Sequence, residues 1–312
     1  MYIVDAQRTE QLLPYGALVA ALSEAFAMPA DKVCAPSRMH YAVADPNGSQ
    51  RTLLIMPAWA EDAGVVVKLV NVVPNNGQLG LPAIQAQVLV ADSATGAWSV
   101  MIDGATLTAR RTAAASAVAA QWLAPATPDT MLVVGTGRLS KEMVAAHRQV
   151  RPSIKRVLVW GRDSHKAAHI AQQITGGEAA EDLARACGQA QIISCCTLSA
   201  QPLVRGEWIQ AGTHVDLVGA YRPDLRESDG ALVAKARVFV DTLAGANGEA
   251  GDLLQAQTEG VFAMQDIEAD LQQLAQGNIV RQESDITLFK SVGAALEDFV
   301  AARLVAGQVT AG

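Results

Sequence analysis

The segment MLVVGTG at residues 131–137 constrains the fold of this chain more than any other feature. Its apolar half predicts a buried strand, and its two glycines lead into a helical pattern at residues 138–150. A strand that turns through glycines onto a helix N-terminus presents backbone N–H groups and a positive dipole to an anion such as pyrophosphate. Ser140 occupies the third small position of the G-x-G-x-x-G/A pattern, which departs from the usual form. The segment therefore predicts a dinucleotide site.

The chain after this turn alternates between strand and helix patterns. Strands are predicted at residues 131–134, 156–160, 190–195, 213–219 and 238–241, with helices at residues 138–150 and 164–174. Such alternation is typical of parallel βαβ units, so we predict an α/β fold with a Rossmann-type, doubly wound parallel sheet.

The first third of the chain is richer in strands. We predict a helix at residues 11–28, strands at 41–43, 52–56, 64–73 and 86–90, a hairpin turn at 92–96 and a helix at 107–123. The segment APATPDT at residues 124–130 ends that helix with two prolines, and we place a domain junction there. Helical periodicity at residues 287–304 predicts a last helix that packs back on the first domain. These patterns predict an α+β domain built from both chain ends, residues 1–122 and 288–312, and a dinucleotide-binding domain at residues 123–287.

Charge and composition exclude several classes of protein. The formal net charge of -7 argues against a general nucleic-acid binder, which needs surplus Lys and Arg. No basic segment leading into an apolar core begins the sequence, and no run reaches the roughly 18 apolar residues that span a bilayer. We expect a cytoplasmic protein with no membrane partner. The four cysteines lack metal-site spacing, so no metal is expected; they fit reduced, structural roles, with redox roles as the alternative.

The end of the second predicted strand bears on which dinucleotide is bound. Gly161 stands where an acidic residue usually binds the ribose hydroxyls, and Arg162 follows directly. A guanidinium suits a 2′-phosphate, and Ser164 and Lys166 would add donors. NADPH is therefore the expected cofactor, with NADH as a second possibility. In the alternative interpretation Arg162 is an exposed turn residue and Asp163 binds the ribose.

Five separated motifs resemble the ornithine cyclodeaminase/mu-crystallin family in the order that the family has them. Beside the glycine turn they are MIDGATLTARRTAAASAVA (101–119), PLVRGEW (202–208), GTHVDLVG (212–219) and TLFKSVGAALED (287–298). The resemblance runs from about Arg38 to the last predicted helix. It implies a Rossmann domain beside a substrate-binding and dimer-forming domain, and hence a homodimer that acts on a small amino or imino acid.

Three basic residues match those that hold the substrate carboxylate in this family. They are Arg38 in APSRM, Lys68 in VKLVN and Arg111 in LTARRT. Lys68 interrupts an apolar strand, and a buried ammonium group needs an anion, which supports its assignment as a catalytic and substrate-binding residue. The alternatives are that Lys68 points into solvent and that Arg111 lies on a helix surface.

The segment VGAYRPD at residues 218–224 departs from the cyclodeaminase motif, where an aspartate stands in place of Tyr221. A phenol, with an ordinary pKa of about 10, is a poor general base at neutral pH. The segment resembles ketimine reductases instead, so we expect reduction of small cyclic imino acids such as Δ1-pyrroline-2-carboxylate or Δ1-piperideine-2-carboxylate. Tyr221 either donates a hydrogen bond or shapes the pocket. The alternatives are an ornithine cyclodeaminase, an alanine-type dehydrogenase and a crystallin-like protein that binds NADPH or another ligand without turnover.

The remaining cofactor assignments follow the resemblance, with one departure. Leu139 replaces a glutamine of the family's phosphate loop, and Arg138 and Ser140 are expected to supply donors in its place. Thr197 is expected either to lie at the nicotinamide half of the cofactor or to serve only as an N-cap or turn residue. The predicted cofactor residues are Gly135, Thr136, Gly137, Arg138, Leu139, Arg162, Ser164, Thr197 and Val218.

Two further groups are expected to lie outside the chemistry. Asp224, Glu227 and Asp229 follow the tyrosine motif in a polar segment and are predicted to be solvated, with Asp224 nearest the site. His214, in a predicted strand, is expected to be packed or hydrogen-bonded rather than catalytic.

Overall fold

The computed structural model describes residues 1–29, 31–44, 50–277 and 279–310, and packing divides the chain into two units. Unit 1 comprises Met1–Arg111 and Ala294–Gly312, and unit 2 comprises Thr112–Gly293. The first boundary falls within helix α3 (Gly104–Leu123), upstream of the proline-containing segment where we placed the junction. The second falls after strand β14 (Thr287–Lys290), which therefore belongs to unit 2.

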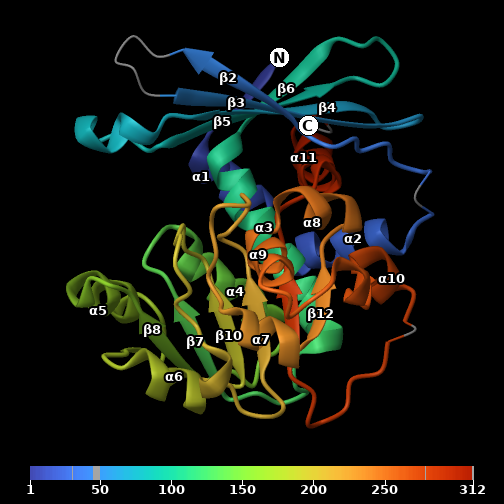
Figure 1. Cartoon of the computed structure of the whole chain (residues 1–312). Coiled ribbons are helices and arrows are strands. Elements are labelled where there is room, and N and C mark those ends of the chain that lie inside the picture. Colours follow the sequence, from blue (N-terminus) through green and yellow to red (C-terminus); the bar gives the residue numbers. More distant parts are fainter. Residues whose placement is uncertain (30, 45–49, 278, 311–312) are drawn as a thin grey trace. The chain divides into compact units, whose positions relative to one another are not determined.

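Unit 1 is built on a six-stranded sheet with the order β1-β6-β5-β4-β3-β2. Its neighbours pair antiparallel, except that β1 runs parallel to β6. The strands, labelled in part in Figure 1, are β1 (Tyr2–Val4), β2 (Met39–Ala44), β3 (Gln50–Ala60), β4 (Gly64–Val72), β5 (Ile84–Ala91) and β6 (Trp98–Asp103). The helices of the unit are α1 (Ala6–Leu12), α2 (Tyr15–Ala27), the short 3-10 helix η1 (Pro74–Leu79), the start of α3, and α11 (Ala295–Thr310).

One face of this sheet is covered by α11, which packs against β3, β4 and β5. Successive side chains of a strand point to opposite faces, so Val66, Lys68 and Val70 of β4 lie together on the covered face and are buried. The last helix thus returns to the first part of the chain, as predicted, and places its side chains beside Lys68.

The helix predicted at residues 11–28 is interrupted in the structure. α1 ends at Leu12, and α2 begins at Tyr15 with Pro14 as its N-cap. Proline has no backbone N–H to continue a helix, and it is tolerated at the beginning of one. The apolar spacing continues through this position and conceals the break.

Unit 2 contains an eight-stranded sheet in which every pair is parallel, with the order β13-β12-β14-β11-β10-β7-β8-β9. Beside β14, its strands are β7 (Thr130–Val134), β8 (Arg156–Trp160), β9 (Gly177–Ala179), β10 (Ile192–Cys195), β11 (His214–Leu217), β12 (Arg237–Val240) and β13 (Ala269–Asp270). From β7 the chain builds outward through β8 on one side and through β10 on the other. This reversal of strand order is the switch point at which open α/β sheets bind ligands.

The helices of unit 2 follow its strands along the chain (Figure 1), and the predicted Rossmann-type fold is confirmed. They are the end of α3, then α4 (Leu139–Val150), α5 (Ser164–Gln172), α6 (Leu183–Gln189), α7 (Gly230–Lys235), α8 (Leu243–Glu249), α9 (Gly251–Thr258) and α10 (Leu271–Ala275). Two 3-10 helices, η2 (Gly206–Trp208) and η3 (Met264–Asp266), complete the unit. In the part of the chain that the structure describes, no helix has the length and apolar character needed to cross a membrane.

The prediction of a helix from residue 287 is wrong for its first eight residues, because 287–290 form β14 and α11 begins only at Ala295. This strand lies between β11 and β12, and its four residues are buried. A short apolar run fits a buried strand and a buried helix equally well, so periodicity could not distinguish them.

His214 is packed and hydrogen-bonded, as predicted. It lies fully buried in β11, with Nδ1 2.9 Å from the Thr287 hydroxyl of β14. Burial lowers the pKa of His214 well below its usual value, so the ring is neutral. The residue serves the core of the sheet.

Candidate active site

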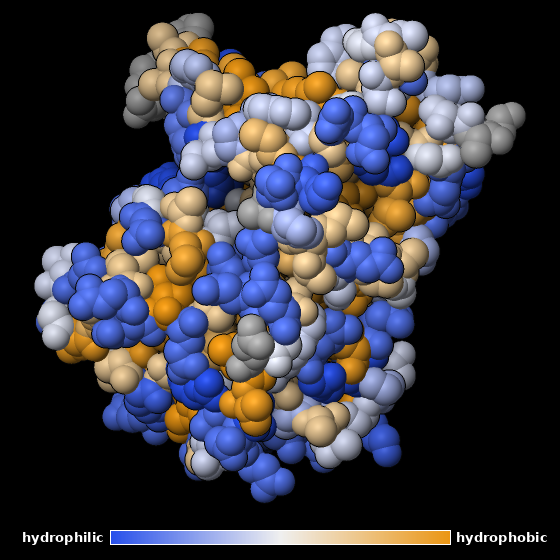
Figure 2. Space-filling model, turned by 90° about the vertical axis from the view of Figure 1, so that its right-hand side faces the viewer, coloured by the Kyte–Doolittle hydropathy of each residue, from blue (hydrophilic) through white to orange (hydrophobic). Residues whose placement is uncertain are grey.

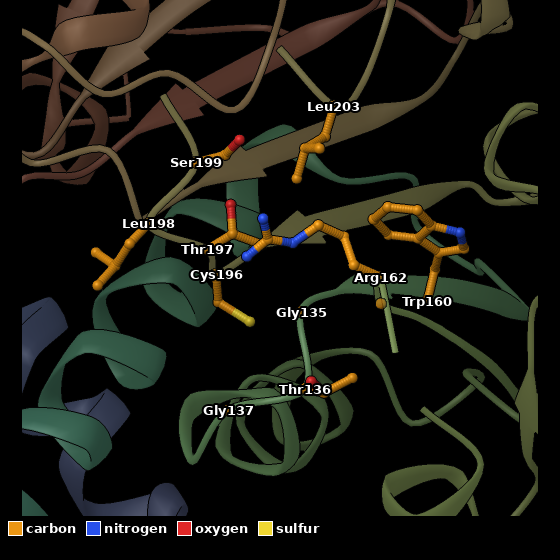
Figure 3. Close-up of a pocket in the computed structure, with 11 residues that line it drawn as sticks. Gly135, Thr136, Gly137, Trp160, Arg162, Cys196, Thr197, Leu198, Ser199 and Leu203 are labelled. Atoms are coloured by element: carbon orange, nitrogen blue, oxygen red, sulfur yellow. The ribbon is translucent and has the colours of Figure 1, made fainter. Parts of the chain in front are cut away.

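Unit 2 contains a pocket at the carboxyl ends of β7, β8 and β10, at the switch point of the sheet (Figure 3). Its volume is about 270 Å³. It is lined by Gly135, Thr136 and Gly137 after β7, by Trp160, Gly161 and Arg162 at the end of β8, and by Cys196, Thr197, Leu198, Ser199 and Leu203 after β10. Ligands of open α/β sheets bind at this position.

The glycines of the turn fit a bound dinucleotide. Gly135 has a φ of 134°, and a Cβ there would lie 2.9 Å from the Cys196 sulfur, so only glycine fits. A Cβ on Gly161 would lie 2.5 Å from a methyl carbon of Thr136. A Cβ on Gly137 would meet nothing within 4 Å, so that position is open to a ligand. The backbone is therefore closely packed behind the turn and free in front of it.

Ser140, the unusual third position of the motif, stabilises the turn itself. Its hydroxyl donates to the Gly135 carbonyl at 2.9 Å, and the residue is fully buried. The expectation that Ser140 offers a donor to the cofactor is wrong, because the hydroxyl already bonds within the loop.

The structure brings some of the predicted cofactor residues to the pocket and leaves others outside its lining. Gly135, Thr136, Gly137, Arg162 and Thr197 line it. The other predicted residues are Arg138 and Leu139 at the start of α4, Ser164 as the exposed first residue of α5, and Val218, which is buried after β11.

Arg162 and Asp163 are used differently, although they are adjacent. The Arg162 side chain extends into the pocket in Figure 3. Asp163 caps α5, where its carboxylate accepts the Lys166 N–H at 3.1 Å, and the Lys166 ammonium lies 3.9 Å from the same side chain. Of the two residues, only Arg162 lines the pocket, so the positively charged side chain is the one available to a bound ligand.

Thr197 is fixed by a buried acid. The Glu227 carboxylate accepts the Thr197 N–H at 2.6 Å and its hydroxyl at 2.9 Å. Burial raises the pKa of Glu227 to about 7, and the nearby Lys290 ammonium opposes this rise. The prediction that Glu227 is solvated is wrong, because its side chain is completely buried.

The other two acids of that segment behave differently from Glu227. Asp224 is exposed and pairs with Arg222, as expected for a solvated residue. Asp229 is half-buried and caps α7, where it accepts the Leu232 N–H at 2.9 Å. Its role is therefore structural.

Unit 1 contains a second cluster of functional interest, formed by Lys68 of β4 and Arg111 of α3. The Lys68 ammonium lies 2.8 and 2.7 Å from the two carboxylate oxygens of Asp298. Arg111 pairs with Glu297 at 2.6 Å and with Asp298 at 2.9 Å. All four side chains are at most 4% exposed. The alternatives that Lys68 points into solvent and that Arg111 lies on a helix surface are therefore wrong.

Arg38 belongs to the same electrostatic neighbourhood. It precedes β2 and is half-buried, and its charge contributes to lowering the pKa of Lys68. Burial is the main cause of that shift, which takes the pKa of Lys68 to about 8; Arg111 adds to it and Asp298 opposes it. Three cations thus lie near one another, and two of them, Lys68 and Arg111, contact the acids Glu297 and Asp298.

Glu297 and Asp298 are the functional residues that sequence reasoning missed. They stand side by side in AALEDFVAARL, an otherwise largely apolar helical segment. A buried acid needs a cation, just as a buried lysine needs an anion. That signal would have identified them as partners of Lys68 and Arg111.

Tyr221 lies outside the residues that line the pocket. It follows Gly219, whose carbonyl accepts the Tyr221 N–H at 3.1 Å, and its ring packs against the apolar core of unit 2. This contact favours a role in shaping the loop after β11.

Comparison with known proteins agrees with this arrangement. Residues 2–312 match the model of the ornithine cyclodeaminase/mu-crystallin family. The chain belongs to this family. The family was predicted from five motifs, and that prediction is confirmed.

Similar members of the family include reductases. The Delta(1)-pyrroline-2-carboxylate reductase of Paracoccus denitrificans is 36% identical over 261 residues, which cover 82% of this chain and 83% of the relative. Ketimine reductase mu-crystallin of Rattus norvegicus is 34% identical over 309 residues, which cover 97% and 94%. The solved structure of Thermococcus litoralis Delta(1)-pyrroline-2-carboxylate reductase in complex with NADH and L-proline has a TM-score of 0.93 and 30% identity, covering 100% of this chain and 98% of that one.

Proposed function

We propose that this member of the family is an NAD(P)H-dependent reductase of small cyclic imino acids such as Δ1-pyrroline-2-carboxylate or Δ1-piperideine-2-carboxylate. The cluster of Lys68, Arg111 and Arg38 supports this proposal most strongly, because it gathers an ammonium group and two guanidinium groups, the donors that bind a carboxylate. The pocket of unit 2 has the glycine turn that a dinucleotide needs. The named reductases among its relatives act on substrates of this class.

The proposed reaction reduces a C=N bond beside the carboxylate. When bound, the reduced nicotinamide supplies the hydride that adds to the imine carbon. Lys68, Arg111 and Arg38 bind the carboxylate and thereby fix the orientation of that carbon. A ring nitrogen that is already protonated needs no further proton, because hydride addition converts the iminium cation into a neutral amine. For an unprotonated imine, Lys68 has a pKa that lets it donate a proton near neutral pH.

A direct assay tests this function. We expect the purified protein to oxidise NADPH or NADH when a cyclic ketimine carboxylate is added. Release of ammonia and proline from ornithine, without reduction of any ketimine, would instead establish a cyclodeaminase. Oxidation that requires pyruvate and ammonia would establish an alanine-type dehydrogenase. Cofactor binding without turnover of any of these substrates would leave a crystallin-like binding protein.

NADPH is the cofactor that we propose, because Arg162 rather than Asp163 lines the pocket. Arg162→Asp removes a charge-assisted bond to the 2′-phosphate, so we expect the affinity for NADPH to fall about 10- to 100-fold while that for NADH changes little. Fluorescence titration of both cofactors measures this. Asp163→Asn is the control, since asparagine also caps helices. Equal binding of NADPH and NADH by the parent protein would contradict the assignment of Arg162.

The pKa of Lys68 predicts how carboxylate binding depends on pH. Pyrrole-2-carboxylate stays a planar anion between about pH 6 and pH 10, so its own charge does not change there. Lys68 loses its proton as the pH rises above about 8, and the affinity for the inhibitor should fall. Calorimetry of the parent protein at several pH values measures the decline. Lys68→Arg keeps the positive charge and should make the profile flat, whereas a flat profile in the parent protein would contradict the prediction.

We also propose that the protein is a homodimer that uses the uncovered face of the six-stranded sheet. Met39, Tyr41, Val43, Trp59 and Val65 are exposed, and the strand register places them on the face opposite Lys68. Apolar atoms gather at the top of Figure 2, where Figure 1 draws this sheet. Exposed apolar side chains that gather on one sheet face are typical of an interface. Sedimentation should give twice the monomer mass for the parent protein, and Tyr41→Lys should give the monomer mass.

A cytoplasmic location of the protein stays a prediction.

A further inference from the structure

Glu227 joins two loops that follow neighbouring strands of unit 2. One of its carboxylate oxygens accepts the N–H and the hydroxyl of Thr197, which follows β10. The other oxygen accepts the Gly219 N–H, which follows β11, at 2.7 Å. A single buried side chain therefore bridges the loops at the carboxyl ends of β10 and β11.

The backbone of Glu227 is in turn bonded to a buried acid, which itself pairs with a buried lysine. Asp252 of α9 accepts the backbone N–H groups of Glu227 and Ser228 at 2.7 and 2.8 Å. Its second oxygen lies 3.2 Å from the ammonium group of Lys290 in β14. Because Glu227, Asp252 and Lys290 are fully buried, their positions are fixed relative to the sheet.

The two bridged loops are in direct backbone contact. A Cβ on Gly219 would lie 1.7 Å from the Thr197 carbonyl oxygen and 2.5 Å from its nitrogen. A side chain at position 219 would therefore not fit against Thr197. The carboxylate of Glu227 bonds both loops at this point of close approach.

Thr197 also lines the pocket, on the side away from β8. In doubly wound sheets the strand after the glycine turn binds the adenosine half of a dinucleotide, and the other half lies across the switch point. Arg162 and Trp160 at the end of β8 thus mark the adenosine side. Thr197 marks the nicotinamide side.

We propose that Glu227 is a positioning residue for the nicotinamide half of the cofactor, acting through Thr197 and Gly219. The inference rests on the proposed function, since it requires the pocket to bind a nicotinamide dinucleotide. It explains why a charged side chain is buried beneath this loop and has no exposed surface of its own.

Glu227→Gln tests the proposal, because glutamine has one acceptor oxygen and one donor amide in place of two acceptors. Whichever way the amide is turned, its donor faces an N–H of Thr197 or Gly219, and at least one bond is lost. We expect the affinity for NADPH and NADH to fall at least about tenfold. The affinity for ADP, which lacks the nicotinamide and its ribose, should stay within about twofold of the parent value.

Asp229→Asn is the matched control, because it makes the same chemical change in the same segment. The Gly206 and Leu232 N–H groups both donate to one oxygen of Asp229, and asparagine retains that oxygen. We expect this variant to bind every ligand as the parent does. Thr197→Val, which removes only the hydroxyl bond, should weaken binding of the dinucleotides by a smaller factor and serves as the test if Glu227→Gln does not fold.

Equal losses of ADP and dinucleotide affinity in Glu227→Gln would overturn the proposal, because they would indicate general damage to the pocket. Unchanged binding of NADPH and NADH would overturn it as well. Either result leaves the proposed function intact if the parent protein binds a dinucleotide. A parent protein that binds neither NADPH nor NADH would overturn the proposed function together with this inference.

Discussion

Replacing Lys68 by methionine is expected to lower kcat/KM for a cyclic imino acid by about a thousandfold, which corresponds to about 4 kcal/mol. Methionine keeps the length of the side chain but removes the ammonium group that binds the carboxylate. A hydrogen bond to a charged group contributes about 1.5–3 kcal/mol, and the lost orientation of the substrate accounts for the remainder. Asp298 keeps its contact with Arg111, so the fold tolerates the change. Steady-state kinetics with the ketimine measure the effect.

The two adjacent arginines of α3 provide the control for this prediction. Arg111→Met should reduce kcat/KM comparably, since Arg111 shares Asp298 with Lys68. Arg110 instead donates to the Leu13 carbonyl at 2.8 and 2.7 Å and lies over the ring of Tyr15. Arg110→Met should lower the melting temperature while kcat/KM at lower temperature stays near the parent value. Equal kinetic losses in the two variants would contradict the assignment of Arg111.

Asp298→Asn is expected to lower the free energy of unfolding at pH 7 by about 3–5 kcal/mol, the usual cost of breaking a buried ion pair from one side. Lys68 would then lose the carboxylate that it contacts, while Arg111 keeps its pair with Glu297. Denaturant unfolding of the parent and the variant measures the difference. Adding Lys68→Met to Asp298→Asn should restore part of the stability, because the double variant no longer buries the unpaired ammonium.

The same loss of stability should depend on pH. The pKa of Lys68 is about 8 in the folded chain and near 10.5 in the unfolded chain, so the unfolded chain binds more protons between these values and stability rises with pH there. Without Asp298 the folded pKa falls further, and this rise begins at lower pH. The deficit of the variant should therefore be smaller at pH 9.5 than at pH 7. A deficit that is the same at both pH values would contradict this account.

Local signals predicted much of the fold from the sequence. The strand, turn and helix of residues 130–150 follow from an apolar run, two glycines and helical periodicity, all of which act between near neighbours. The strand β14 was assigned to a helix because its identity depends on β11 and β12, which pair with it from distant parts of the chain. Pro14 shows that a local signal is also missed when the apolar spacing continues across it.

The candidate site was predictable where residue type alone carries the chemistry. Lys68 and Arg111 were found through resemblance and through the cost of burying a charge. Asp298 was missed because it meets Lys68 across 230 positions of sequence. Glu227 was misjudged for the same reason: its polar neighbours in sequence suggest solvent, while Asp252 and Lys290 bury it through the tertiary fold.

The place of β14 in the sheet has a consequence for how the chain folds during synthesis. A nascent chain that lacks residues 287–290 holds β11 and β12 with no strand between them, and both present unpaired backbone groups. Unit 1 likewise needs α11, which covers its sheet and supplies Asp298 as the ion-pair partner of Lys68. Both units thus depend on residues 287–310, and we expect a chain in which these residues have not yet been synthesised to need chaperone protection.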